Sequence, residues 1–383
     1  MKKLYLFLLL SISAIGFSQA PANYYNNATG TGYALKTQLK TIITSGHVDK
    51  GYGSGTSQTN NGLWSAYGTT DRDNGIGYEN DNTIVDIYSE NPAGTDPYNF
   101  NFNATSGGNS GQCGSYSNEG DCYNREHLIP QSYFGSTGIM RNDVHHIYPT
   151  DGKVNGIRSD YAFGKVNVAS FTSLNGSKLG SALNSGYSAG FSGTVFEPID
   201  EFKGDIARVF FYFATRYESQ MASFYSTYTA VDCRVMFNGS ANQVFSPTFL
   251  NILLTWNAQD PVSQKEIKRN NAAYVHQGNR NPYIDHPEYV TSIWGTPLAI
   301  STVDALAAIS VYPNPSNNHR INIESEKILD QIQLININGQ LMQEIKNPSV
   351  QNNTYTLENL PSGFYFLKLT SENQTATKKV IVN

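Results

Sequence analysis

Residues 122–163 read CYNREHLIPQSYFGSTGIMRNDVHHIYPTDGKVNGIRSDYAF. We expect Arg125-Glu126-His127 to end a strand, because a proline follows within a few residues and breaks regular structure. Asp143 to Pro149 is a second strand-like run, and Val154 to Arg158 begins a helix after a turn at Asp151-Gly152. The order strand, long loop, strand, helix predicts one compact unit, with a histidine on the first element and an amide on the last.

The same stretch gathers reactive side chains in a chain with only 15% charged residues. A neutral imidazole, with an unperturbed pKa near about 6.5, can take a proton from water. A carboxylate and an amide oxygen suit a hard divalent cation, and guanidinium groups bind phosphate. The combination favours phosphodiester cleavage. The side chains concerned are Glu126, His127, Arg141, His145, His146, Asn155 and Arg158.

A family resemblance rests on three motifs in order. They are Arg125-Glu126-His127, Asp143-Val144-His145 and Val154-Asn155-Gly156-Ile157-Arg158-Ser159. Together they resemble the secreted bacterial endonuclease I family, a branch of the His-Me finger (ββα-metal) nucleases. Lys203 to Arg208 and Gln277 to Pro282 also resemble segments of that family, so the resemblance covers about residues 25–295.

The resemblance implies roles for individual residues. His127 would be the general base, and Glu126 and Asn155 would hold a divalent metal ion, foremost Mg²⁺, with Mn²⁺ and Ca²⁺ as alternatives. The substrate would be DNA, with RNA as a second substrate, and the products would carry 5′ phosphates. His145 is expected to be structural.

The arginine that holds the scissile phosphate stays open. The family places it in a variable loop, so Arg141, Arg158 and Arg208 are all candidates. Arg158 and Arg141 are assigned here to the catalytic set, and Arg208 and Arg125 to substrate binding.

Other functions and sites compete with this one. The first alternative is a secreted binding or adhesion protein whose nuclease-like domain is inactive, and a second is a phosphodiesterase of small nucleotides. Cys113, Cys122, His127 and His145 could instead form a structural zinc site, but their spacing is irregular.

The N-terminus has the pattern of a signal peptide, residues 1–20, with two lysines, an apolar run and small residues before the cut. Its removal lowers the net charge from −5 to −7. A negative balance opposes nucleic-acid binding unless a local basic face or metal ions offset the repulsion. No later segment is apolar enough to span a membrane.

In an exported chain we expect Cys113 and Cys122 to form a disulfide and Cys233 to be a buried thiol.

Elsewhere periodicity predicts helices at 33–43, 202–217 and 248–275, short strands and turns within 166–200, and a buried strand at 83–88. The run Asp71-Arg72-Asp73-Asn74-Gly75 resembles the start of a calcium loop, but Asn82 stands where the closing glutamate belongs, so a plain turn is favoured.

The last segment changes composition and alternates in the manner of strands. Residues 298–310 form a linker, and residues 311–383 predict a small all-β sandwich. Val311 to Pro315, Asn338-Gly339, Leu360 to Tyr365 and Lys378 to Asn383 resemble C-terminal sorting domains of exported Bacteroidetes-type proteins. That resemblance implies passage through an outer-membrane secretion machinery. We therefore expect a secreted monomer with an α+β domain at 21–297, containing the ββα-metal finger, followed by the sandwich.

Overall fold

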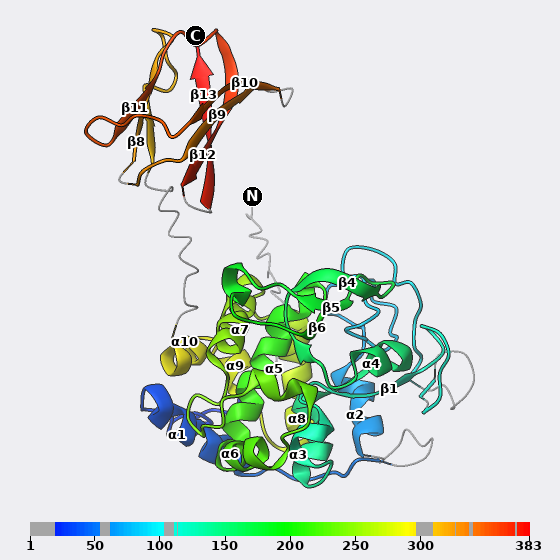
Figure 1. Cartoon of the computed structure of the whole chain (residues 1–383). Coiled ribbons are helices and arrows are strands. Elements are labelled where there is room, and N and C mark those ends of the chain that lie inside the picture. Colours follow the sequence, from blue (N-terminus) through cyan, green and yellow to red (C-terminus); the bar gives the residue numbers. More distant parts are fainter. Residues whose placement is uncertain are drawn as a thin grey trace, which may run out of the picture. The chain divides into compact units, whose positions relative to one another are not determined.

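The computed structural model describes residues 20–53, 62–102, 111–112, 114–295, 309–325, 327–336, 340–371 and 374–383. The chain divides into two compact units, residues 1–297 and 298–383, each with its own hydrophobic core (Figure 1). Nearly all of the predicted signal peptide, the predicted linker up to residue 308, and Cys113 lie outside the described residues. Within the described ranges, no helix has the length and apolarity needed to cross a bilayer.

The larger unit is built around helix α5, Lys203–Arg216, in which every residue is buried. Helices α1 (Gly32–Thr44) and α7 (Pro247–Gln259) pack against it, and Figure 1 shows α5 in the middle of the unit. The predicted helices at 33–43 and 202–217 are therefore confirmed. The region 248–275 is two helices, because α8 (Gln264–Gln277) begins anew with a capping box at Ser263.

Shorter helices complete this unit. They are α2 (Gly62–Thr70), α3 (Gln131–Phe134), α4 (Gly152–Arg158), α6 (Glu218–Thr227), α9 (Pro282–Asp285) and α10 (Glu288–Trp294), with 3-10 turns η1 (Ile139–Asn142), η2 (Val144–His146), η3 (Gly186–Ser188), η4 (Asp200–Phe202) and η5 (Asp232–Met236).

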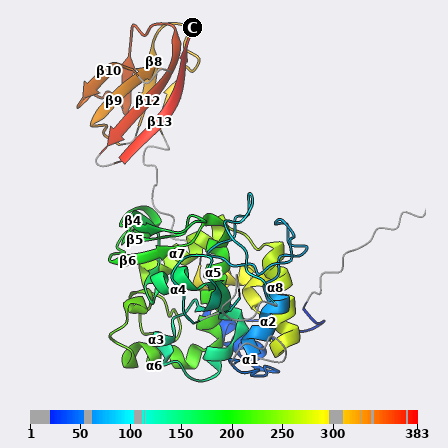
Figure 2. The ribbon, with the colours of Figure 1, turned by 90° about the vertical axis from the view of Figure 1, so that its right-hand side faces the viewer.

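A four-stranded sheet of order β3-β6-β5-β4 flanks the helices. Its strands are β3 (Ala162–Phe163), β4 (Val166–Thr172), β5 (Lys178–Ala182) and β6 (Thr194–Glu197). Strands β3 and β6 pair in parallel, while β4, β5 and β6 are antiparallel and lie together at the edge of the unit in both views (Figure 1 and Figure 2). This matches the short strands expected within 166–200.

The strand–loop–strand–helix unit forms as predicted. Strand β1 (Tyr123–His127) pairs antiparallel with β2 (Ile147–Asp151), with Glu126 opposite Tyr148, and α4 follows directly. The Asp151 side chain caps α4 by accepting a hydrogen bond from the Val154 backbone N–H at 2.8 Å.

One expected strand is wrong and another begins later than expected, for the same physical reason. Residues 83–88 are irregular, with two isolated bridges at Ile84 and a turn beginning at residue 87, because the Asp86 carboxylate accepts hydrogen bonds from the backbone N–H groups of Tyr88 and Asp151. The run from Asp143 begins as a 3-10 turn, because the Asp143 side chain accepts from the His145 N–H. Short acidic side chains of this kind compete with strand ladders for backbone donors.

The smaller unit is a two-sheet β domain. One sheet has the order β10-β9-β12-β13 and the other β11-β8-β7. The strands are β7 (Ser310–Tyr312), β8 (Ile321–Glu324), β9 (Gln331–Asn336), β10 (Leu341–Lys346), β11 (Thr354–Leu357), β12 (Gly363–Ser371) and β13 (Gln374–Val382). Alternate residues of β12, such as Leu367 and Leu369, point into the core, as the period-two pattern predicts.

Candidate functional site

Two segments that are separate in sequence line one cavity of about 460 Å³. Strand β1 contributes Arg125, Glu126 and His127, and α4 contributes Asn155 and Arg158. The first turn after β1 and the residues just beyond α4 complete the wall; these are Pro130, Gln131, Ser132, Ser159 and Asp160. The pairing of β1 with β2 and the short link into α4 bring the two segments together.

Glu126 is a buried carboxylate with one committed oxygen. Its Oε1 accepts a hydrogen bond from the Tyr88 hydroxyl at 2.8 Å and lies 3.1 Å from Nη1 of Arg158. Its Oε2 takes part in neither contact. Burial raises the pKa of Glu126, and the positive charge of Arg158 partly offsets that effect. A cation at Oε2 would relieve the remaining cost of burying the charge.

His127 presents a neutral ring. Its Nε2 lies 3.3 Å from the backbone carbonyl oxygen of Arg141, and a carbonyl oxygen only accepts, so Nε2 carries the hydrogen. Nδ1 is then the nitrogen with the lone pair. Burial lowers the pKa of His127 well below its ordinary value, and nearby His146 adds to the effect. The ring is therefore in its base form at neutral pH.

Asn155 is oriented by a neighbouring amide. Its Nδ2 donates to Oδ1 of Asn124 at 2.6 Å, which leaves the Asn155 Oδ1 as an acceptor for a ligand. Gly156 beside it is required by packing, because a Cβ there would lie 2.0 Å from the Tyr116 hydroxyl oxygen. The Asn-Gly pair thus sits on a helix, at a point of close approach to Tyr116.

Arg158 ties the helix to the strand. It is 1% exposed, and its Nη1 and Nη2 donate to the backbone carbonyls of His127 and Leu128 at 3.0 and 2.8 Å. With the Glu126 contact, one guanidinium fixes both the acid and the base. Since its terminal nitrogens are engaged in this way, Arg158 is better placed to position these groups than to bind a phosphate.

Arg125 and Arg141 meet on the ring of Tyr52. Their guanidinium carbons lie 3.4 and 3.8 Å from its centroid, and the same ring stacks with His127 at a centroid distance of 6.0 Å. Arg125 Nη1 also donates to the Tyr52 and Gly53 carbonyls. Arg141 uses only Nε, which donates to Gln131, so its terminal nitrogens have no hydrogen bond or ion pair among the described residues.

Arg208 lies away from the cavity, which corrects its assignment to the site. It is buried in α5, where Nε and Nη2 contact the two carboxylate oxygens of Glu266 at 2.6 and 2.7 Å. Its Nη1 donates to Asn257 and to the Asp260 carbonyl. The neighbouring Asp205 pairs with Lys265, so this segment is a buried ionic contact between α5 and α8.

His145 is buried, and its Nε2 lies 3.0 Å from the backbone carbonyl of Asn279. Asp143 next to it accepts from the hydroxyls of Tyr212 and Tyr217 and from Gln277. These contacts join the strand–loop–strand–helix unit to α5 and α8, in keeping with the expected structural role of His145.

The cysteines and the calcium-loop motif are two further features that the sequence analysis singled out. Cys233 is a buried free thiol, as expected. The pairing of Cys113 with Cys122 stays a prediction, because Cys113 lies outside the described residues. Asp71, the first residue of the calcium-loop motif, pairs with Arg269 at 2.9 Å, so it is not free to start such a loop.

Sequence reasoning missed Tyr52, Tyr88 and Asn124. Each acts on a predicted site residue: Tyr52 on His127, Tyr88 on Glu126 and Asn124 on Asn155. Asn124 lies three residues before His127 and could have been found as a neighbour of the motif. Tyr52 and Tyr88 carry no sequence signal, because they reach the site only through tertiary folding.

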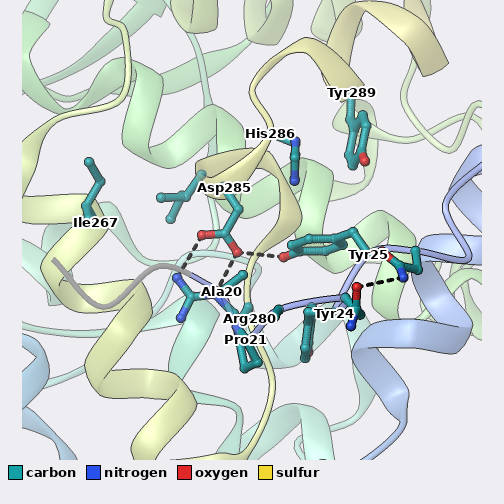
Figure 3. A pocket seen from close by; sticks show the side chains of 13 residues that line it. Ala20, Pro21, Tyr24, Tyr25, Ile267, Arg280, Asp285, His286 and Tyr289 are labelled. Carbon is teal, nitrogen blue, oxygen red and sulfur yellow. Dashed lines mark hydrogen bonds and ion pairs between the residues drawn. The ribbon is translucent and has the colours of Figure 1, made fainter. Parts of the chain in front are cut away.

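A second cavity, of about 660 Å³, lies where residues 20–26 meet α9 and α10 (Figure 3). The Asp285 carboxylate at its centre accepts hydrogen bonds on both oxygens. Asp285 accepts from Arg280 and from the Tyr25 hydroxyl, at 2.7 and 2.6 Å. The Tyr24 hydroxyl and Nη1 of Arg280 are buried there without a hydrogen-bond partner among the described residues.

Two protein families match the chain. The Endonuclease I family matches residues 31–288, and the secretion system C-terminal sorting domain matches residues 310–383.

Relatives with names support the same grouping. An extracellular ribonuclease of Bacillus amyloliquefaciens is 34% identical over 76% of this chain and 84% of its own length. An extracellular ribonuclease of Bacillus subtilis is 34% identical over 75% of this chain and 83% of its own. Endonuclease-1 of Buchnera aphidicola subsp. Baizongia pistaciae is 28% identical over 38% of this chain and 46% of its own.

Proposed function

The chain belongs to the Endonuclease I family, and from this we propose that it is a divalent-metal-dependent, non-specific endonuclease cleaving DNA and RNA to products with 5′ phosphates. It is a secreted nuclease, given its extracellular relatives and its sorting domain. One observation carries the proposal. An acid, a neutral imidazole and an amide, Glu126, His127 and Asn155, line a single cavity.

His127 acts as the general base in this proposal. Its Nδ1 has the lone pair, because Nε2 is bound to the Arg141 carbonyl, and the ring is neutral at working pH. A water molecule in the cavity would give one proton to Nδ1 as its oxygen bonds to the phosphorus; the bond from phosphorus to the 3′ oxygen breaks, and that oxygen leaves as a hydroxyl after taking a proton from solvent. The Arg141 contact keeps the ring in the required tautomer, as the orienting partner of a catalytic histidine does.

Glu126 and Asn155 fit a divalent cation. The donor set is one carboxylate and one amide oxygen, the hard ligands that Mg²⁺, Mn²⁺ and Ca²⁺ accept. Oε2 of Glu126 and Oδ1 of Asn155 are the atoms left available once Tyr88, Arg158 and Asn124 have made their contacts. When bound, such a cation stabilises the negative charge that develops on the phosphate and on the leaving oxygen.

Arg141 is the best candidate for binding the scissile phosphate. Of the three arginines considered, Arg208 is remote and both terminal nitrogens of Arg158 are engaged, whereas the terminal nitrogens of Arg141 are free among the described residues. Its backbone carbonyl touches the proposed base. Arg125 adds positive charge on the same Tyr52 ring, so a local basic face offsets the negative net charge of the chain.

The substrate range follows from the relatives and from the motif resemblance. Two are named ribonucleases, which supports RNA as a substrate, and one is named an endonuclease without a stated substrate; DNA is assigned from the motif resemblance. We also propose that the smaller unit, residues 310–383, is read by an outer-membrane secretion machinery.

Cleavage of plasmid DNA and of a structured RNA, with Mg²⁺ or with a chelator, tests the proposal. Wild type and an Asp232→Asn control, altered at an exposed acid outside the cavity, should nick both substrates in Mg²⁺ only. Glu126→Gln and His127→Ala should leave both substrates uncut in Mg²⁺. Equal cleavage in chelator would reject the metal requirement, and wild-type rates in both variants would reject the site.

A further inference from the structure

Three acidic side chains converge in the segment between α2 and β1, outside the cavity of His127. One carboxylate oxygen each from Glu79, Glu90 and Asp96 lies within 4.8 Å of the others. Glu79 is exposed, Asp96 is half-buried and Glu90 is 1% exposed. The group is therefore open to solvent on one side and anchored in the protein on the other.

Two buried carboxylate oxygens in this segment have no hydrogen-bond partner among the described residues. Oε1 of Glu90 is buried and has no hydrogen-bond partner among the described residues, and the same holds for Oδ1 of Asp73, a residue 2% exposed. Buried polar atoms are almost always paired, because an unpaired one costs the free energy of its lost hydration. Two unpaired carboxylate oxygens in one short segment call for a cation.

The surrounding charges point the same way. The carboxyl groups of Asp96, Glu79 and Asp73 all lie close enough to Glu90 to interact with it electrostatically. Lys265 is a cation near Glu90, but its Nζ is already paired with Asp205. The protein groups described around Glu90 thus leave a surplus of negative charge.

We propose that Glu79, Glu90 and Asp96 bind a Ca²⁺ ion, with Asp73 beside it. Ligand oxygens at about 2.4 Å from one Ca²⁺ ion can be at most about 4.8 Å apart, and each pair of these three oxygens meets that limit. Ca²⁺ accepts six to eight oxygens in irregular geometry, which suits carboxylates on turns, whereas Mg²⁺ demands a regular octahedron. Backbone carbonyls and water would supply the remaining ligands.

The site is distinct from the calcium-loop motif noted in the sequence. That motif begins at Asp71, which is paired with Arg269, and only its third residue, Asp73, lies near the new site. The role of the ion would be structural. It would hold residues 73–96 together, close to the turn that carries Tyr88.

Calcium binding to the full-length protein tests this proposal, by calorimetric titration and by thermal melting with Ca²⁺ or chelator. All proteins carry Glu126→Gln, so that ion binding at the His127 cavity is suppressed. The parent should bind one Ca²⁺ with a Kd of about 0.1–1 mM, typical of extracellular sites, and melt a few degrees higher in Ca²⁺. Asp232→Asn should behave like the parent.

Two variants decide the outcome. Glu90→Gln should melt at least as high as the parent in chelator, because it removes a buried charge, but should gain nothing from Ca²⁺. Glu79→Gln alters an exposed side chain, so folding is not at risk, and it should weaken binding at least about tenfold. Parent-like binding in both variants, or no binding by the parent at about 10 mM Ca²⁺, would overturn the proposal.

Discussion

The Nε2 atom of His127 lies 3.3 Å from the backbone carbonyl oxygen of Arg141, which directs the lone pair of the ring to Nδ1. The proposed base is thereby held by the loop that also carries the proposed phosphate-binding arginine. The position of the His127 ring relative to Arg141 is therefore fixed by this contact.

Replacing His127 with alanine should lower kcat by about 10²–10⁴, the usual contribution of a general base, while KM changes little. Steady-state cleavage of a short duplex measures both constants. Circular dichroism, recorded beside wild type, checks that the fold is kept once the contact between the ring and the Arg141 carbonyl is lost. An unchanged kcat would assign the proton transfer to another group.

In a plot of kcat/KM against pH, the fall in activity on the acidic side should occur at an unusually low pH. The pKa of His127 is lowered by burial, so the base form persists as pH falls through 6.5 and is lost only below that value. We expect kcat/KM to stay near its maximum at pH 6.5, and a limb centred at or above that pH would contradict this.

Folding must be followed in the same samples. His145 and His146 have pKa values lowered to about 4 by burial, against 6.5 when unfolded. The unfolded chain therefore takes up protons first, and stability falls as pH drops from 6.5 toward 4. Melting curves at each pH separate this loss from titration of the base.

Asn124→Ala should raise the Mg²⁺ concentration needed for half-maximal activity by about 10–100-fold, because the Asn155 amide loses the partner that orients it. Activity at saturating Mg²⁺ should recover in large part. Asn26→Ala, which removes only an exposed contact to Asn23, serves as control. Equal Mg²⁺ curves for the two variants would show that Asn155 needs no support.

Arg141→Ala and Arg208→Ala should impair the protein in different ways: the first should lose activity and the second should lose stability. Arg141→Ala should lower kcat/KM by about 10²–10³ without loss of stability, as expected for a charge that acts on the phosphate. Arg208→Ala leaves Glu266 buried and unpaired and should cost about 3–5 kcal/mol in urea unfolding. The reverse pattern would restore Arg208 to the substrate site.

The sequence was most informative where contacts are local. Glu126, His127 and Asn155 meet because β1, β2 and α4 follow one another closely, so their motif order already predicted a shared site. Arg208 was misassigned because motif similarity does not distinguish a buried ion pair from a substrate contact. The strand expected at 83–88 failed because Asp86 captures backbone donors, a contact that periodicity does not register.

Tyr52 and Tyr88 could not have been found in this way. Both lie in irregular segments far from the motif, and only packing delivers their rings to His127 and Glu126. The supporting side chains of the site therefore required the structure.

The contact between Arg158 and Glu126 bears on the order in which the enzyme matures. A permanent cation already accompanies the buried acid, so folding and export would not have to await the proposed metal ion. Loading would then be the final step, taken outside, where divalent ions are plentiful and where degrading nucleic acid no longer endangers the producer.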